Sequence, residues 1–99
     1  MTMWVINTGE QVESPFTFRI LPGAIKTIGR AARADFIVDA ALVSRVHCRL
    51  TAGAADLEVV DLESTNGTFV NGARVTRAHL IPGDRLKVGR VELQVGRSD

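Results

Sequence analysis

The stretch Asp61-Leu62-Glu63-Ser64-Thr65-Asn66-Gly67-Thr68 carries most of what this chain reveals about its fold and function. It follows Ser44-Arg45-Val46-His47 at about the distance of one β-hairpin, and Ile28-Gly29-Arg30 lies upstream of both. The three stretches gather hydroxyls, an amide and two guanidiniums in segments typical of loops between short strands. They contain hydrogen-bond donors but no obvious nucleophile, base or metal cluster. This set of donors predicts a site that holds a phosphate rather than one that transforms it.

Short apolar runs, broken every few residues by Gly, Pro, Asn or Asp, predict an all-β sandwich. No run keeps a 3.6-residue period long enough for a helix. Turns are expected at Pro22-Gly23, Asn71-Gly72, Pro82-Gly83-Asp84 and Gly89-Arg90. The expected strands are Met3–Asn7, Phe16–Leu21, Ala24–Gly29, Phe36–Val38, Val46–Thr51, Leu57–Leu62, Phe69–Val70, Arg85–Val88 and Val91–Val95.

One predicted hairpin brings the two informative stretches together. If Val46–Thr51 pairs antiparallel with Leu57–Leu62, Thr51 faces Leu57 and Val46 faces Leu62. Extrapolation then places Ser44 opposite Ser64. A slip in register would change the facing pairs but not the end of the sheet that they share.

Composition limits the function classes open to this chain. Its 99 residues predict a single domain over residues 1–99, and 12 Lys and Arg against 11 Asp and Glu leave a net charge of only +1. With no Tyr and a single Trp, nothing indicates a nucleic-acid partner. No segment approaches the ~20 apolar residues of a membrane span, and a secretion signal is absent. The lone Cys48 favours a reducing, cytoplasmic setting.

These residues also allow simpler interpretations. Ser44 with His47 lacks the Gly-x-Ser-x-Gly elbow of a hydrolase, and His47, Cys48 and His79 lack the spacing of metal ligands. Residues 64–68 also suit an ordinary turn, because Asn and Ser bond their own backbone and Gly takes the left-handed conformation. However, three consecutive hydrogen-bonding side chains before the glycine exceed what a turn requires.

The order and spacing of the three stretches resemble the forkhead-associated (FHA) domain. The resemblance spans about residues 26–95 and includes Phe69-Val70-Asn71-Gly72 and Pro82-Gly83-Asp84. It implies an all-β, eleven-stranded antiparallel β-sandwich whose loops at one end bind phosphothreonine in an extended peptide. No cofactor and no catalysis are implied.

The resemblance also assigns roles to individual residues. Arg30, Ser44, Arg45 and Thr65 would surround the phosphate, since guanidiniums offer forks of donors and hydroxyls add neutral hydrogen bonds. Two or three charge-assisted bonds, after ordering costs, are compatible with micromolar binding at about −8 kcal/mol.

Further residues would serve the peptide and the loops. Asn66 would bond the peptide main chain, Gly29 and His47 would shape the loops, and Gly67 would let the chain turn. Leu42, two residues before the loop serine, is a candidate for contacting the side chain three after phosphothreonine. The simpler interpretation is that Leu42 is buried and contacts no ligand.

The expected partner is a phosphothreonine-containing protein segment, from a Ser/Thr kinase or its substrate. Ten Arg against two Lys, with many Ala, favour a bacterial source. The expected function is therefore a phosphopeptide-recognition module in Ser/Thr kinase signalling. A phosphate-independent assembly or self-association domain is the alternative, and a small hydrolase using Ser44 and His47 is the third hypothesis.

Overall fold

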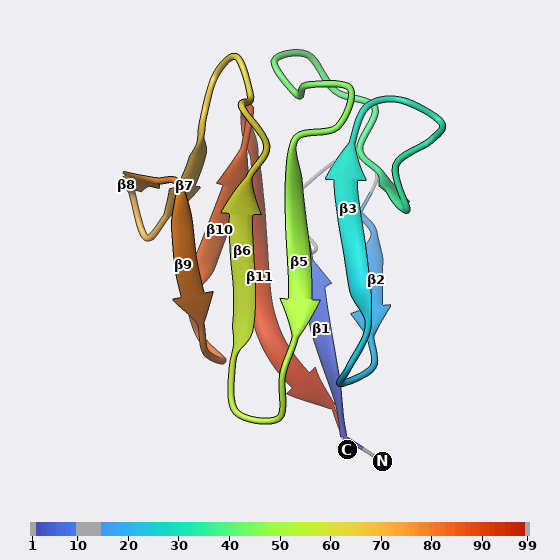
Figure 1. Ribbon diagram of the computed structural model, residues 1–99, viewed down its shortest axis with the longest axis vertical. Coiled ribbons are helices and arrows are strands. Elements are labelled where there is room, and N and C mark those ends of the chain that lie inside the picture. The colour runs from blue at the N-terminus through green and yellow to red at the C-terminus, as the bar shows by residue number, and fades with distance from the viewer. Residues whose placement is uncertain (1, 10–14, 99) are drawn as a thin grey trace.

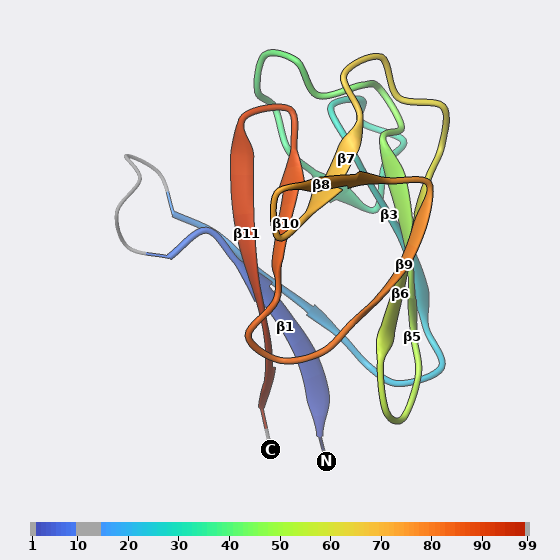
Figure 2. The same ribbon diagram turned by 90° about the vertical axis from the view of Figure 1, so that its left-hand side faces the viewer.

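The computed structural model describes residues 2–9 and 15–98, which form two β-sheets packed face to face (Figures 1 and 2). These residues contain eleven strands and no helix, as the sequence predicts. The strands are β1 (Met3–Asn7), β2 (Thr17–Ile20), β3 (Ile25–Gly29), β4 (Phe36–Ile37), β5 (Cys48–Ala52), β6 (Leu57–Asp61), β7 (Thr68–Val70), β8 (Ala73–Val75), β9 (Arg77–Leu80), β10 (Arg85–Val88) and β11 (Val91–Ser98).

The sheets divide the strands into six and five. The six-stranded sheet has the order β2-β1-β11-β10-β7-β8, and the five-stranded sheet has the order β4-β3-β5-β6-β9. The pairs for which a register is defined are antiparallel except for β3 with β4, where Ile28 lies beside Phe36 in a parallel ladder. The sequence analysis expected an antiparallel sandwich, and this two-residue pair is its one parallel detail.

Alternating apolar residues from both sheets form the core. In β5, Cys48, Leu50 and Ala52 are buried while Arg49 and Thr51 are partly exposed. The alternation puts one face of the strand against the opposite sheet. The same pattern in β10 and β11 buries Leu86, Val88, Leu93 and Val95 on the facing sheet. The core thus fixes which strand ends meet, and with them the positions of the loops.

Two strands were missing from the sequence expectation. β8 and β9 lie in a segment whose residues are mostly exposed, so the apolar alternation that identifies a half-buried strand is weak. The hairpin turn before β8 was predicted correctly: Asn71 and Gly72 both have positive φ, of 49° and 87°, and Val70 pairs with Ala73. The turn at Gly89-Arg90 was also predicted, since Val88 pairs with Val91.

The predicted register of the β5–β6 hairpin is wrong by one residue. Ala52, not Thr51, pairs with Leu57, and Cys48 pairs with Asp61. The reason is a tighter loop over residues 53–56, closed by a 2.9 Å hydrogen bond from the amide of Gly53 to the carbonyl of Asp56. The loops at the other end of the hairpin still lie together, as expected from either register.

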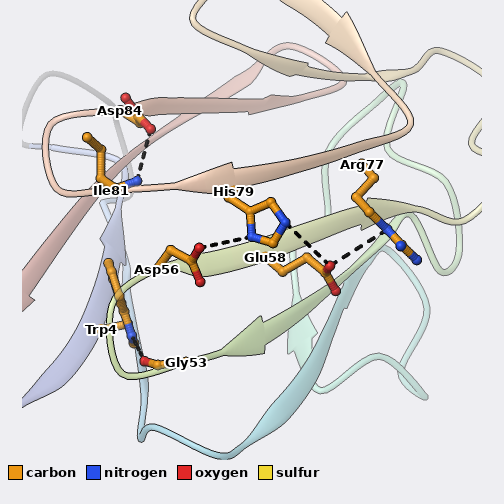
Figure 3. A network of polar contacts seen from close by, with 8 residues as sticks. All are labelled: Trp4, Gly53, Asp56, Glu58, Arg77, His79, Ile81 and Asp84. Atoms are coloured by element: carbon orange, nitrogen blue, oxygen red, sulfur yellow. Dashed lines mark hydrogen bonds and ion pairs between the residues drawn. The ribbon is translucent and has the colours of Figure 1, made fainter.

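The hairpin loop is fixed to the opposite sheet. The indole Nε1 of the fully buried Trp4 donates to the carbonyl of Gly53 at 2.8 Å (Figure 3). The guanidinium of Arg97 stacks over the Trp4 ring and donates to the carbonyl of Ala54 at 2.7 Å. β1 begins and β11 ends near this loop, whereas the loops after β3, before β5 and after β6 lie at the far end of the sandwich (Figure 1).

Candidate functional site

Three loops at that far end enclose an open cleft. They join β3 to β4, β4 to β5 and β6 to β7 (Figures 1 and 2). The cleft is lined by every residue that the sequence analysis expected to touch a ligand: Arg30, Leu42, Ser44, Arg45, Thr65 and Asn66. Arg33 and Glu63 also line it, and the sequence analysis gave neither a role.

A direct contact between Ser44 and Thr65 joins the two motif-bearing loops. The Ser44 hydroxyl oxygen accepts a 3.1 Å hydrogen bond from the amide of Thr65. The sequence analysis placed Ser64 opposite Ser44, and the one-residue register shift explains why Thr65 occupies that position instead. The contact leaves the Ser44 hydroxyl hydrogen available to donate to a bound anion.

Arg30 is exposed but anchored. Its Nε donates to the carbonyl of Val43 at 3.1 Å, and its amide donates to the carbonyl of Ser44 at 2.9 Å. The guanidinium is therefore oriented by one nitrogen, which leaves the two terminal nitrogens free for a ligand. Arg45, from the same cleft wall, is also exposed.

Gly29 permits the close approach of β3 to the β4–β5 loop. A Cβ atom at this position would lie 2.1 Å from the carbonyl oxygen of Arg45 and 2.8 Å from the Cα of Val46. Both atoms belong to the main chain, so a side chain here would push the loop away from Arg30. Glycine is needed at position 29 for space, since its φ does not lie in the positive region.

His47 is fully buried and bridges two loops. Its Nδ1 accepts a 3.1 Å hydrogen bond from the amide of Ser44, so Nε2 carries the proton and donates to the carbonyl of Gly67 at 2.9 Å. The imidazole bonds the main chain of Ser44 and not its hydroxyl. This arrangement gives no support to a hydrolase in which His47 activates Ser44.

Asp61 organises the loop that follows β6. The hydroxyls of Ser64 and Thr68 both donate to its Oδ1, and the amide of Ser64 donates to its Oδ2. Burial raises the pKa of Asp61, but these hydrogen bonds and the nearby His47 outweigh it and hold the pKa below its usual value. The sequence analysis gave Asp61 and Thr68 no role, although both flank the predicted loop.

Gly67 and Ser64 complete the turn. Gly67 has a φ of 91°, and its amide donates to the Ser64 hydroxyl oxygen at 3.0 Å. Ser64 therefore both donates and accepts within the loop and is buried, which sets it apart from the exposed Thr65 beside it.

Asn66 is already bonded to the neighbouring loop. Its Nδ2 donates to the carbonyl of Leu42 at 3.1 Å. Leu42 has a φ of 71°, which is unusual for a residue other than glycine, and its side chain is 43% exposed. The exposure contradicts the simpler interpretation that Leu42 is a buried residue with no access to a ligand.

Among the residues that the structure describes, no group of three or more His, Cys, Asp and Glu side chains is placed to hold a metal ion. In the same residues there is no helix with the length and hydropathy needed to cross a membrane.

The chain is similar in sequence to known proteins. The model of the FHA domain family matches residues 26–89. The chain is 43% identical over 77 residues to the ABC transporter ATP-binding/permease protein Rv1747 of Mycobacterium tuberculosis, covering 78% of this chain and 9% of that protein. It is 35% identical over 89 residues to the glycogen accumulation regulator GarA of the same organism, covering 90% of this chain and 53% of GarA. The chain thus spans only a small part of Rv1747 and about half of GarA.

Solved structures of FHA domains are similar to this chain. A structure from a study of phosphothreonine-dependent FHA domain interactions aligns with a TM-score of 0.85 at 31% identity, covering 95% of each chain. The FhaA FHA domain, solved in complex with the intracellular domain of Rv3910, aligns with a TM-score of 0.83 at 32% identity. That alignment covers 93% of this chain and 98% of the FhaA domain.

Proposed function

Because the chain belongs to the FHA domain family, we propose that its loop cleft binds phosphothreonine in an extended segment of another protein. The domain is then a phosphorylation-dependent interaction module in Ser/Thr kinase signalling. The domain binds a partner after a kinase has phosphorylated that partner, and the domain carries out no reaction on it.

The contact between Ser44 and Thr65 is the observation that carries this proposal. It brings two loops together so that two hydroxyls and the guanidiniums of Arg30 and Arg45 line one cleft. Arginine donors match phosphate oxygens in number and geometry, and the hydroxyls add neutral hydrogen bonds. The phosphate then supplies most of the affinity, and the peptide around it supplies less.

Asn66 suits a role in holding the peptide main chain. One hydrogen of its Nδ2 is used on Leu42, which fixes the orientation of the amide. A second Nδ2 hydrogen and the Oδ1 acceptor remain for the main chain of a peptide in extended conformation. Gly29, His47 and Gly67 act behind the cleft, where they set the positions of the loops.

The partner class follows from the ligand. A phosphothreonine segment of a Ser/Thr kinase, or of a substrate of such a kinase, is the proposed partner. The mycobacterial relatives favour a bacterial signalling system, and the buried thiol of Cys48 fits a reducing cytoplasm.

Calorimetry with paired peptides tests the proposal. A phosphothreonine peptide should bind with micromolar affinity, and its unphosphorylated form at least ~30-fold more weakly, or about 2 kcal/mol. Arg30→Ala should remove most of the difference. Arg19→Ala, at an exposed arginine on β2 outside the cleft, is the matched control and should preserve it. Equal affinity for both peptides would instead indicate phosphate-independent assembly.

A further inference from the structure

Arg33 projects from a turn that is fixed in place. The amide of Ala34 donates to the carbonyl of Ala31 at 3.0 Å, which closes the turn around Arg33. Immediately after it, the carboxylate of Asp35 accepts from the amide of Thr27 at 2.9 Å and from its hydroxyl at 3.2 Å. The backbone that carries Arg33 is thus held to β3, and the side chain faces a defined part of the cleft.

Arg33 differs from Arg77 and Arg85, the arginines that form ion pairs in the part of the chain that the structure describes. Arg77 lies near Glu58 on the outer face of β6 and β9 (Figure 3), and Arg85 lies near Glu92. Among the residues that the structure describes, Arg33 forms no ion pair. In a chain whose acidic and basic residues are nearly equal in number, an unpaired guanidinium inside the ligand cleft is available for an anion.

Arg33 is a third guanidinium in the cleft, in addition to those of Arg30 and Arg45. Arg30 and Arg45 also line a smaller hollow together with Asp39, and Arg33 does not line that hollow. Two guanidiniums already suffice to balance a phosphothreonine of charge about −2. Arg33 therefore remains as a separate cationic point in the same cleft.

The opposite wall of the cleft carries the opposite charge. Glu63 lies in the β6–β7 loop, whereas Arg33 lies in the β3–β4 loop, and β5 lies between β3 and β6 in the sheet. A ligand with a second negative group would be attracted toward Arg33 and repelled by Glu63. The two walls thus specify on which side of the cleft such a group can lie.

We propose that the segment bound in this cleft carries a second anionic side chain beside its phosphothreonine, and that Arg33 binds this second anion. The inference rests on the proposed function and narrows its ligand class. A carboxylate and a second phosphate share the required chemistry, since a guanidinium bonds either in a fork. An ion pair at an exposed site is expected to strengthen binding about two- to fivefold.

A scanning peptide panel tests the inference. The reference peptide has one phosphothreonine flanked by alanines. In each member of the panel, a single Glu or a single additional phosphothreonine replaces one of the four positions on either side. The third position after the phosphothreonine is left as alanine, because Leu42 is expected to face it. Fluorescence polarisation measures the affinity of each member relative to the reference for the native domain and for Arg33→Gln. Arg19→Gln is the control, with the same charge change outside the cleft.

The affinity of each panel member, divided by the affinity of the reference peptide, separates the outcomes. We expect at least one position where Glu, phosphothreonine or both raise the affinity of the native domain about two- to fivefold over the reference peptide. At that position, Arg33→Gln should abolish the increase in affinity and Arg19→Gln should retain it. No gain at any position, or a gain that survives Arg33→Gln, would overturn the inference while reference binding still upholds the proposed function. Failure of the native domain to bind the reference peptide would overturn the proposed function itself.

Discussion

The Nε2 atom of His47 lies 2.9 Å from the carbonyl oxygen of Gly67, so one fully buried imidazole joins loops that are 20 residues apart in the sequence. Its Nδ1 accepts from the amide of Ser44, one residue from Arg45 and next to the ligand cleft. Both ring nitrogens are engaged with main-chain groups. His47 therefore supports the shape of the site from behind, whereas Arg30 faces solvent in front of it.

We expect His47→Ala to destabilise the free domain. The substitution leaves a partly buried amide and a buried carbonyl without their partner, at a cost of about 1–3 kcal/mol. A loss of this size lowers the melting temperature by several degrees in a domain of this length. Thermal unfolding followed by circular dichroism measures it, with His79→Ala as the control, since His79 is the other histidine and is exposed.

The same melts should show a melting temperature for Arg30→Ala close to that of the native domain. The residue is exposed, and within the described residues its side chain makes a single hydrogen bond, from Nε to the carbonyl of Val43. If Arg30→Ala were the less stable of the two variants, this division between a supporting residue and a binding residue would be wrong.

Gly29→Ala should damage both stability and binding. The added Cβ would lie 2.1 Å from the carbonyl oxygen of Arg45, so either β3 or the loop must move. Crowding of this kind costs about 1–3 kcal/mol, and movement of the loop displaces Arg45 from the cleft. Urea denaturation and phosphopeptide titration test the two effects. Gly96→Ala in β11 is the control, because its nearest contact would be 4.0 Å away.

The sequence predicted at which end of the sandwich the candidate site lies. It predicted the contacts within that site less well. Short alternating runs and turn residues identify most strands, and an antiparallel hairpin brings residues 44–47 near residues 62–68 in either register. The exact pairing depended on the length of the loop at residues 53–56, which a hydrogen bond between Gly53 and Asp56 shortens. Alternation alone does not contain that information.

Contacts within and between the loops were also beyond the sequence. Asp61 holds Ser64 and Thr68 through its carboxylate, and Asn66 bonds the carbonyl of Leu42. The first set depends on how one loop folds back on the end of β6, and the second contact depends on how two loops meet in space after the sheets have formed. An acidic residue at a strand end and the main-chain carbonyl of a loop residue carry no sequence signal for such contacts.

Asp61 should make the domain sensitive to acid. Its pKa is lower in the folded state, so its stabilising effect is present above the unfolded pKa of about 3.9 and is lost as the pH falls through the folded value. Asp35, whose pKa is lowered chiefly by the hydrogen bond from the amide of Thr27, acts in the same direction. The free energy of unfolding, measured in urea between pH 7 and 2.5, should therefore fall below about pH 4.

Asp61→Asn isolates the contribution of this carboxylate. At pH 7 the variant should be less stable by about 1–3 kcal/mol, because Asn has only one acceptor oxygen. When that oxygen accepts from the Ser64 and Thr68 hydroxyls, the Nδ2 group faces the amide of Ser64, which is also a donor. Its stability should also change less with pH than that of the native domain. Asp39→Asn, at an exposed carboxylate, is the control. An Asp61→Asn curve parallel to the native one would show that Asp61 does not link stability to pH.

Leu42 should favour an aliphatic side chain at the third position after phosphothreonine. Its side chain is 43% exposed and lines the cleft, so it offers apolar surface but no partner for a carboxylate. Peptides with Leu, Ala or Asp at that position should bind in decreasing order, and Leu42→Ala should reduce the preference for Leu. Leu42→Met, which keeps an apolar side chain of similar size, should largely retain it. Selection of Asp by the native domain would show that Leu42 does not read this position.

Binding of the phosphopeptide should weaken as the pH falls from 7.5 to 5.5. Phosphothreonine has a second pKa near 6, so the free peptide gains a proton over this range and its charge falls from about −2 toward −1. Arg30 and Arg45 favour the dianion, so the pKa of the phosphate is lower when bound than when free, and the bound state must release the proton that the free peptide takes up. Asp35 and Asp61, with their lowered pKa values, stay ionised throughout this range.

Calorimetry at several pH values measures the affinity, and circular dichroism at each pH confirms that the fold persists. A constant affinity across the range, with the fold intact, would mean that the cleft does not distinguish the dianion from the monoanion and that the arginines do not set its selectivity.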